Sequence, residues 1–299
     1  MAKISIIIPA RGEDFKNLTR TLKSIYDNAT GEYEVIVGFD GTVPYTIDES
    51  EDYPNLSCID FPSTVGIKTN VNAMAAMATG KYIYKTDAHC SFGKGFDEIL
   101  QADMEENWIV MPRFKIIKDD WSIQMRDGEE EFYDYFYLCC PLTDPKGFRF
   151  KAGGHWGERT REKLDILIDE TPQIHGSGYF MSKDYYFNTL GGFPNTDIYG
   201  HGMEPINLAL KNWLKGGKVM VNKKTFYAHL HQDNSKRGYH MSKEQEVYTY
   251  DTTAKYWMAN KEPNLLHDIK WFINEKFPGM PTWPNNWEEL QKEYERNNL

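Results

Sequence analysis

The sequence predicts an α/β fold with a mostly parallel central sheet flanked by helices. Short apolar runs rich in β-branched residues alternate with segments whose apolar residues recur at helical spacing. The runs are nearly continuous rather than alternating, as in strands that are buried on both faces of a parallel sheet. Such a sheet needs helices on each side, and 299 residues suffice for one large domain with an appendage.

The expected elements follow one another regularly over the first 117 residues. A strand at 3–8 is expected to end at Pro9, whose ring removes a ladder donor. The other expected elements are a helix at 14–28, strands at 33–39 and 57–61, a helix at 68–78, and strands at 81–86 and 108–117.

After residue 117 the regularity weakens. Residues 119–157 are aromatic, charged and glycine-containing, and segments 153–157 and 236–240 are typical of substrate-closing loops. A helix is expected to begin at Glu204-Pro205 and to stop at Gly216-Gly217. Proline is favoured in the first turn of a helix, and glycine is favoured just after its last turn. A strand is then expected at 218–222, and the segment 226–231 (FYAHLH) follows it.

The C-terminal residues predict a separate part of the molecule. Helical patterns at 243–259 and 288–296 flank a segment rich in Trp and Pro. We therefore expect a main domain over residues 1–242 and a C-terminal helical extension over 243–299 that packs on it.

Composition limits the classes of protein to which the chain can belong. The formal net charge of -10 argues against a broad nonspecific nucleic-acid surface. No apolar run has the length of a membrane span, the N-terminus lacks a signal-peptide pattern, and the four cysteines lack zinc-ribbon spacing. These features favour a cytoplasmic protein with reduced thiols.

Asp87-Ala88-His89 comes directly after the strand expected at 81–86. Side chains at positions i and i+2 of an extended segment leave the same face, and open α/β sheets bind ligands at this edge. A carboxylate oxygen with an imidazole nitrogen suits a divalent ion such as Mn²⁺, which can also hold a diphosphate. The structural alternative is a turn-capping aspartate beside an incidental histidine.

Several short blocks follow one another along the chain: 6–11 (IIIPAR), 37–42 (VGFDGT), 85–90 (KTDAHC), 111–121, 175–181 with 190–193, 202–204 with 216–217, and 228–229. Together these blocks resemble the family-2 glycosyltransferases of the GT-A fold. Within that group they are most similar to the polypeptide N-acetylgalactosaminyltransferases, which use an Asp-x-His metal motif. The resemblance covers about residues 3–231 and implies a Rossmann-like GT-A domain, although Phe39 stands where the pattern has an acid.

The resemblance implies a set of metal ligands and nucleotide-binding residues. Asp87, His89 and His229 would hold Mn²⁺ or Mg²⁺, with His231 as the alternative third ligand because it faces the same way in an extended segment. The nucleotide-diphosphate sugar would be bound by Pro9, Arg11, Asp40, Lys68 and Asp87. For Asp40 a turn-forming role is the alternative.

Glu204 is the expected catalytic residue, because it opens a helix after a Gly-containing turn. Inverting relatives usually take the base from the Asp of a Glu-Asp pair, whereas Pro205 follows Glu204 here. Glu204 would either act as that base or bind the donor sugar, as the matched acid does in retaining relatives.

The expected function is therefore metal-dependent transfer of a sugar from a nucleotide-diphosphate sugar, with UDP as nucleotide, to a hydroxyl acceptor. The acceptor can be a glycan, a protein or a hydroxymethylated base of phage-type DNA. A non-catalytic nucleotide-sugar-binding protein is the alternative of another class. A nucleotidyltransferase is disfavoured, because residues 9–13 (PARGE) lack a glycine-rich basic loop.

Overall fold

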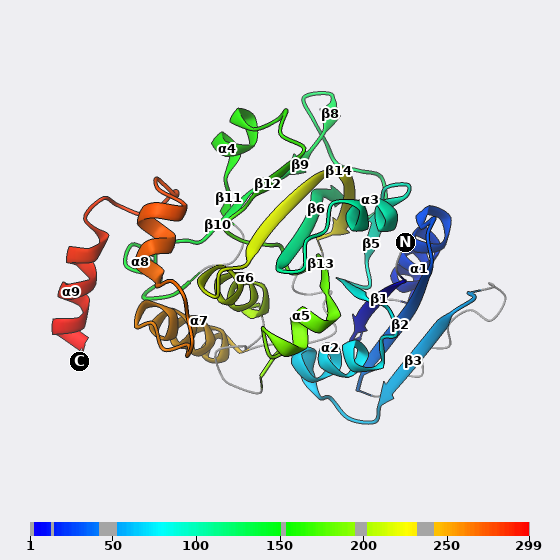
Figure 1. Cartoon of the computed structure of the whole chain (residues 1–299), viewed down its shortest axis with the longest axis horizontal. Coiled ribbons are helices and arrows are strands. Elements are labelled where there is room, and N and C mark those ends of the chain that lie inside the picture. The colour runs from blue at the N-terminus through cyan, green and yellow to red at the C-terminus, as the bar shows by residue number, and fades with distance from the viewer. Residues whose placement is uncertain are drawn as a thin grey trace.

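A mixed ten-stranded sheet forms the centre of the molecule. The structure is a computed structural model that describes residues 3–12, 15–41, 53–150, 154–194, 202–231 and 242–298. The main path of the sheet has the strand order β12-β14-β6-β13-β4-β1-β2-β3, while β5 pairs with β14 and β9 with β6. Helices flank this sheet (Figure 1), as the predicted α/β class requires.

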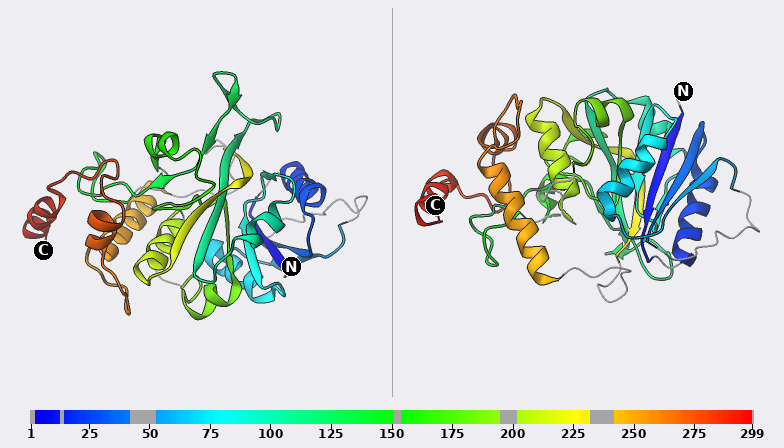
Figure 2. Two further views of the ribbon diagram at one scale, coloured as in Figure 1. Left: turned by 45° about the horizontal axis from the view of Figure 1, so that its top comes forward. Right: turned by 90° about the horizontal axis from the view of Figure 1, so that it is seen from below.

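The N-terminal half of the sheet is parallel and regular. Strand β1 lies between β2 and β4, and β2 is followed by β3, with every pairing parallel. Ile6, Ile7 and Ile8 are fully buried, as expected for a strand covered on both faces. Helices α1 and α2 lie on opposite sides of this part (Figure 2). The bounds are β1 Ile4–Ala10, α1 Phe15–Asn28, β2 Tyr33–Asp40, β3 Leu56–Phe61, α2 Gly66–Met77 and β4 Tyr82–Thr86.

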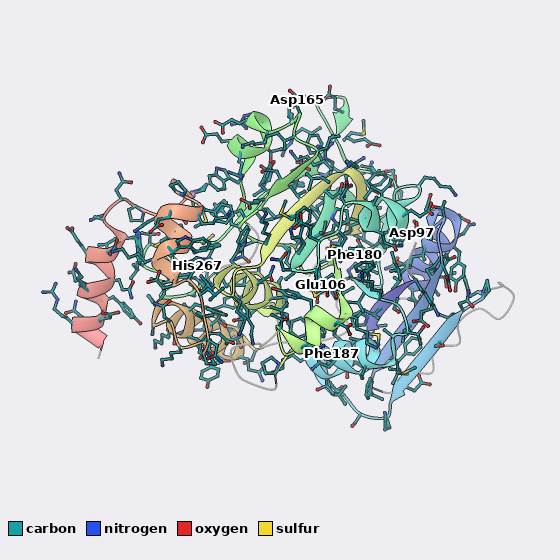
Figure 3. The ribbon with its side chains drawn as sticks, viewed as in Figure 1. Asp97, Glu106, Asp165, Phe180, Phe187 and His267 are labelled. Carbon is teal, nitrogen blue, oxygen red and sulfur yellow. The ribbon has the colours of Figure 1, made fainter. Side chains whose placement is uncertain are left out.

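In the other half of the sheet several pairs are antiparallel, among them β12 and β5 with β14 and β9 with β6. Strand β13 pairs antiparallel with both β4 and β6, whereas β6 and β14 are parallel to each other. The predicted mostly parallel sheet is thus interrupted at β13, where Phe180 is fully buried (Figure 3). The bounds are β5 Cys90–Phe92, α3 Phe96–Ala102, β6 Trp108–Ile117, β9 Phe132–Tyr133, β12 Ile168–Glu170, β13 Gly178–Ser182, α5 Lys183–Asn188, α6 Glu204–Leu214 and β14 Lys218–Leu230.

The segment expected to be irregular carries only short elements. Two-residue strands form small ladders there, β7 with β8 and β10 with β11. Residues 153 and 236–240 of the two expected substrate-closing loops lie outside the described residues. The short elements are β7 Met125–Arg126, β8 Glu129–Glu130, β10 Phe136–Tyr137, β11 Gly154–His155 and α4 Gly157–Glu162.

Two strand boundaries differ from the expectation. Strand β1 continues through Pro9 to Ala10, because β4 pairs with β1 only as far as Ile7 and requires no ladder donor at Pro9. Strand β14 continues past the expected end at residue 222 and has 13 residues. Its register against β6 shifts between Asn222 and Phe226, so a bulge lies just after the expected end.

The C-terminal residues are helical, as predicted, and their first helix, α7, lies beside α6 (Figures 1 and 2). Trp257 Nε1 donates a hydrogen bond to Asn207 Oδ1 at 2.6 Å, and Trp283 Nε1 donates to the carbonyl oxygen of Leu138 at 2.6 Å. The division of the chain at residue 242 stays a prediction. The elements are α7 Lys243–Met258, α8 Ile269–Trp271, the π-helix η3 Phe272–Lys276 and α9 Trp287–Asn298.

None of the helices in the described parts of the chain combines the length and the apolar character that crossing a bilayer requires.

Candidate functional site

Asp87, His89 and His229 form one cluster, which we call the ligand cluster. Each offers one ligand atom, and these atoms all lie within 4.8 Å of one another. Asp87 and His89 follow β4 directly, and His229 lies near the end of β14. Pairing of β14 with β5 brings them together, because His229 is in register with Cys90 and the Leu230 amide donates to the His89 carbonyl at 3.0 Å.

His229 has the burial and the protonation state expected of a metal ligand. Its side chain is buried, and within the described residues neither ring nitrogen makes a hydrogen bond, although Nε2 lies 3.3 Å from Asp87 Oδ2. A buried, unpaired imidazole is costly unless something else satisfies it. Burial lowers the pKa of His229 to about 4 and outweighs the opposite effect of Asp87, while the neighbouring His89 and His231 add to the lowering. The ring is therefore neutral at physiological pH, which metal ligation requires.

Asp87 is held in its charged form. Burial opposes ionisation, but the Lys85 ammonium and the neighbouring His229 and His89 outweigh it and hold the pKa of the Asp87 carboxyl well below its usual range. Lys85 Nζ donates a hydrogen bond to Asp87 Oδ1. One carboxylate with two imidazoles is a donor set that Mn²⁺ accepts, so these residues fit the metal that the sequence predicts.

His231, the alternative third ligand, lies beside the ligand cluster but outside it. Its ring centroid is 4.9 Å from that of His229 and 5.8 Å from that of Phe114. Among the described residues the group of potential ligands contains His229 and not His231. The geometry therefore favours His229 as the third ligand, and the assignment stays a prediction.

Glu204 is the first residue of α6, following Gly202 with a φ of 80°. Its side chain is 8% exposed, and its Oε1 atom is buried without a hydrogen-bond partner in the described part of the chain. Burial raises the pKa of Glu204 to about 7, although its backbone amide and the Lys85 and Lys68 ammonium groups act in the opposite direction. A carboxyl that changes protonation near neutral pH suits general acid–base chemistry.

The first turn of α6 lies close to the ligand cluster because of Gly176. A Cβ atom at Gly176 would meet Pro205 Cγ at 3.2 Å, so glycine permits this approach. The carbonyl oxygen of Gly176 also accepts a hydrogen bond from Lys85 Nζ at 2.7 Å. Lys85, Gly176 and Pro205 thus connect Asp87 with the turn that carries Glu204.

The other residues predicted to bind the nucleotide lie near the edge of the sheet. Asp40 is buried and accepts hydrogen bonds from the backbone amides of Val65 at 2.6 Å and Gly66 at 3.1 Å, at the start of α2. Arg11 Nη1 lies 4.0 Å from Asp40 Oδ2. Asp40 therefore binds the amides at the start of α2, 25 and 26 residues along the chain, and its nucleotide-binding role stays a prediction.

Pro9 and Lys68 are both partly buried, on β1 and in the first turn of α2 respectively. Lys68 is close enough to Glu204 to affect its pKa. Their roles toward a nucleotide also stay predictions.

Two polar residues beside the ligand cluster received no role from the sequence. Lys85 contacts Asp87 from the same strand face. His175 stacks on Phe114 with 4.5 Å between the ring centroids. Its Nδ1 accepts a hydrogen bond from the Ser177 amide at 3.3 Å. For Lys85 a signal existed, since a lysine two residues before Asp87 shares its face of the strand. Nothing in the sequence indicates that His175 packs here.

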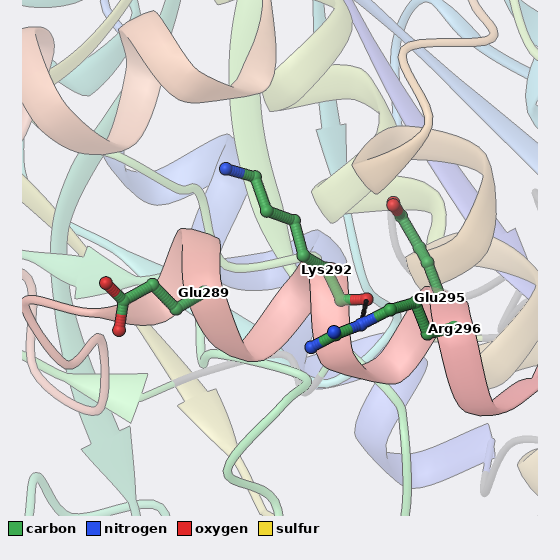
Figure 4. A pocket seen from close by; sticks show the side chains of 4 residues that line it. All are labelled: Glu289, Lys292, Glu295 and Arg296. Atoms are coloured by element: carbon green, nitrogen blue, oxygen red, sulfur yellow. Dashed lines mark hydrogen bonds between the residues drawn. The ribbon is translucent and has the colours of Figure 1, made fainter.

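Two surface depressions lie elsewhere. One follows a single face of α9 and is lined by two acidic and two basic side chains, Glu289, Lys292, Glu295 and Arg296 (Figure 4). The other lies around Leu266 and Trp271, next to His267. Neither contains a residue of the ligand cluster.

A family model matches the N-terminal part of the chain, which includes most of the parallel half of the sheet. Residues 5–164 match the model described as glycosyl transferase family 2. The chain belongs to this family. The match includes Asp87 and His89 but not Glu204 or His229.

The relatives are polypeptide N-acetylgalactosaminyltransferases. This family-2 chain is 25% identical over 240 residues to putative polypeptide N-acetylgalactosaminyltransferase 13 of Drosophila melanogaster, covering 74% of the chain and 40% of the relative. It is 24% identical over 237 residues to polypeptide N-acetylgalactosaminyltransferase 5 of Caenorhabditis elegans, covering 74% and 36%. The chain thus spans about two fifths of the length of these relatives.

Solved structures share the fold. GalNAc-T7, crystallised with UDP, GalNAc and Mn²⁺, matches with a TM-score of 0.68 and 16% identity over 92% of this chain and 56% of that one. A mannosyltransferase from Pyrobaculum calidifontis in complex with GDP-Man and Mn²⁺ matches with a TM-score of 0.51 and 16% identity, over 78% and 58%. The predicted GT-A fold is confirmed.

Proposed function

We propose that this family-2 chain transfers a sugar from a nucleotide-diphosphate sugar to a hydroxyl acceptor and requires a divalent metal ion. The observation that carries the proposal is the ligand cluster, in which a carboxylate and two imidazoles lie within 4.8 Å of one another. Family membership and the folds of solved neighbours with UDP or GDP-Man and Mn²⁺ support it.

The chain's own residues have distinct tasks in this proposal. A bound divalent ion supplies Lewis-acid neutralisation of the diphosphate leaving group. Asp87 contributes the permanent negative charge of the ligand set, and His89 and His229 contribute neutral nitrogen donors. Burial of His229 keeps its ring neutral and ready to bind at physiological pH.

Glu204 is the proposed acid–base or sugar-binding group. Its carboxyl is buried, its Oε1 has no hydrogen-bond partner among the described residues, and its pKa is raised to about 7. As a base it would take the proton of the acceptor hydroxyl, and the product would have inverted configuration. If Glu204 instead binds the donor sugar, the transferred sugar would retain its anomeric configuration. The anomeric configuration of the product, read by NMR, therefore distinguishes the two roles.

The donor and the acceptor are proposed with different support. UDP is the proposed nucleotide, since GalNAc-T7, the neighbour with the TM-score of 0.68, was crystallised with UDP. A protein or glycan hydroxyl is the proposed acceptor, in line with the names of the relatives. A cytoplasmic location stays a prediction, and so does a hydroxymethylated DNA base as acceptor, which neither of the two named relatives supports.

The direct test is donor hydrolysis across UDP- and GDP-sugars, with and without Mn²⁺. We expect turnover of at least one UDP-sugar that disappears when the metal is chelated and returns when Mn²⁺ is added. Binding of the donor without any turnover, with or without peptide and glycan acceptors, would instead indicate a non-catalytic nucleotide-sugar-binding protein.

A further inference from the structure

Lys85 is a buried lysine inside the strand that leads to the ligand cluster. It is 5% exposed, and all five residues of β4 are buried. A buried ammonium group is retained only where fixed partners compensate for its lost hydration. Lys85 Nζ has two such partners in the described part of the chain, Asp87 Oδ1 and the carbonyl oxygen of Gly176 at 2.7 Å.

These two contacts determine which oxygen of Asp87 is available to an ion. Oδ1 is occupied by Lys85, whereas Oδ2 lies 3.3 Å from His229 Nε2, on the side of the imidazoles. A carboxylate held at one oxygen in this way keeps its other oxygen turned toward the imidazoles, which favours ligation through Oδ2. Lys85 therefore fixes the orientation of Asp87 within the ligand cluster.

The same contact changes the charge balance of the ligand cluster. The neutral imidazoles contribute no charge, and Asp87 contributes one negative charge, which the adjacent ammonium of Lys85 offsets. A divalent cation that enters alone meets a nearly uncharged site containing a fixed cation a few ångströms away. A diphosphate reverses this balance, since it brings negative charge that both the ion and Lys85 attract.

We propose that Lys85 is a positioning residue that fixes Asp87 and offsets its charge, so that the divalent ion binds weakly alone and tightly together with the donor diphosphate. This inference rests on the proposed function, because it assumes that the ligand cluster holds the ion. It assigns to Lys85 the dependence of metal affinity on the bound nucleotide. The link from Lys85 through Gly176 to Pro205 places Glu204 beside the same charge.

The experiment compares Mn²⁺ affinity with and without UDP, measured by electron paramagnetic resonance of free Mn²⁺. The variants are Lys85→Met, Lys85→Arg and, as the matched control, Lys211→Met. Lys211 is also a buried lysine in an ion pair, with Glu262 Oε1 at 2.9 Å, but it contacts no residue of the ligand cluster. Lys85→Gln replaces Lys85→Met if the latter does not fold, because it removes the charge and keeps a hydrogen-bond donor.

For Lys85→Met we expect about tenfold tighter binding of Mn²⁺ alone and a correspondingly smaller gain on adding UDP. Lys85→Arg and Lys211→Met should keep the wild-type ratio of the two affinities. Equal or weaker binding of Mn²⁺ alone by the folded Lys85→Met and Lys85→Gln proteins would overturn the inference and leave the proposed function intact. If the wild type binds no Mn²⁺ even with UDP, the proposed metal dependence fails, and the inference fails with it.

Discussion

Two regions of the molecule each hold a carboxyl group withdrawn from solvent, one half-buried and one buried, and the pKa values of the two groups are shifted in opposite directions. At the end of β4, Asp87 contacts a lysine and a histidine, and its pKa is held well below the usual range. At the start of α6, Glu204 has an oxygen without a hydrogen-bond partner among the described residues, and burial raises its pKa to about 7. Desolvation opposes the ionisation of both groups, so burial alone does not determine the charge.

The difference shows how one site can separate two tasks. A carboxylate that stays charged at all working pH values suits a metal ligand, whereas one that titrates near neutrality suits proton transfer. Lys85 affects both groups, by direct contact with Asp87 and at longer range with Glu204. The comparison can be tested by changing one region at a time.

The largest effect is expected for Asp87→Asn. This change removes the charged ligand, and we expect donor turnover to fall on the order of a thousandfold and Mn²⁺ binding with UDP to be lost. The measurements are donor hydrolysis and Mn²⁺ titration. The matched control is Asp97→Asn, since the buried Asp97 carboxylate accepts hydrogen bonds from the Thr30 and Gly31 amides and should affect stability but not Mn²⁺ binding (Figure 3).

Glu204→Gln should reduce turnover by about several hundredfold while Mn²⁺ binding with UDP stays at the wild-type level. The amide keeps the shape of the side chain and cannot exchange a proton. Steady-state rates and Mn²⁺ titration on the same preparation check both parts. A loss of Mn²⁺ binding in this variant would assign Glu204 to the metal region and remove the contrast with Asp87.

Stability should depend on pH through Glu204. A carboxyl whose pKa rises on folding, here from 4.5 to about 7, stabilises the fold below pH 4.5, and this contribution is lost as the pH rises to 7. Relative to Glu204→Gln, the metal-free wild type should lose up to about 3 kcal/mol of unfolding free energy between pH 4.5 and 7.5. Urea unfolding at the two pH values measures this. A constant difference between the two proteins would show that Glu204 is not perturbed.

A smaller effect separates the two candidates for the third ligand. His229→Ala should weaken Mn²⁺ binding with UDP by roughly ten- to a hundredfold, whereas His231→Ala should change it little, because His231 lies outside the ligand cluster. Each variant is the control for the other. The reverse order of the two losses would assign the ligand role to His231.

The sequence predicts the regular part of the fold well because the signals there are local. The apolar run at 108–117 coincides with β6, and the proline and glycine signals around α6 lie where that helix begins and ends. β1 runs past Pro9, since the end of β4 decides whether a ladder donor is needed there. That requirement depends on a partner strand more than 70 residues away in the chain.

The candidate site was predictable in its residue types but not in its contacts. Asp87 and His89 are close in sequence, and a family resemblance pointed to His229. The contact of Lys85 with the Gly176 carbonyl joins residues 91 positions apart, and no local pattern encodes it. The same holds for His175, whose place beside Phe114 follows from the antiparallel insertion of β13 between β4 and β6.

The bulge in β14 changes which of its side chains face each side of the sheet. Side chains alternate between the two faces, and Lys223, Lys224 and Thr225 separate the two registers that β14 forms with β6. Three residues outside both registers reverse the alternation, so odd-numbered residues after the bulge take the face that even-numbered residues occupy before it. In an uninterrupted strand, Ala228 would point where His229 points now. An odd-length insertion thus directs an imidazole, rather than a methyl group, toward Asp87.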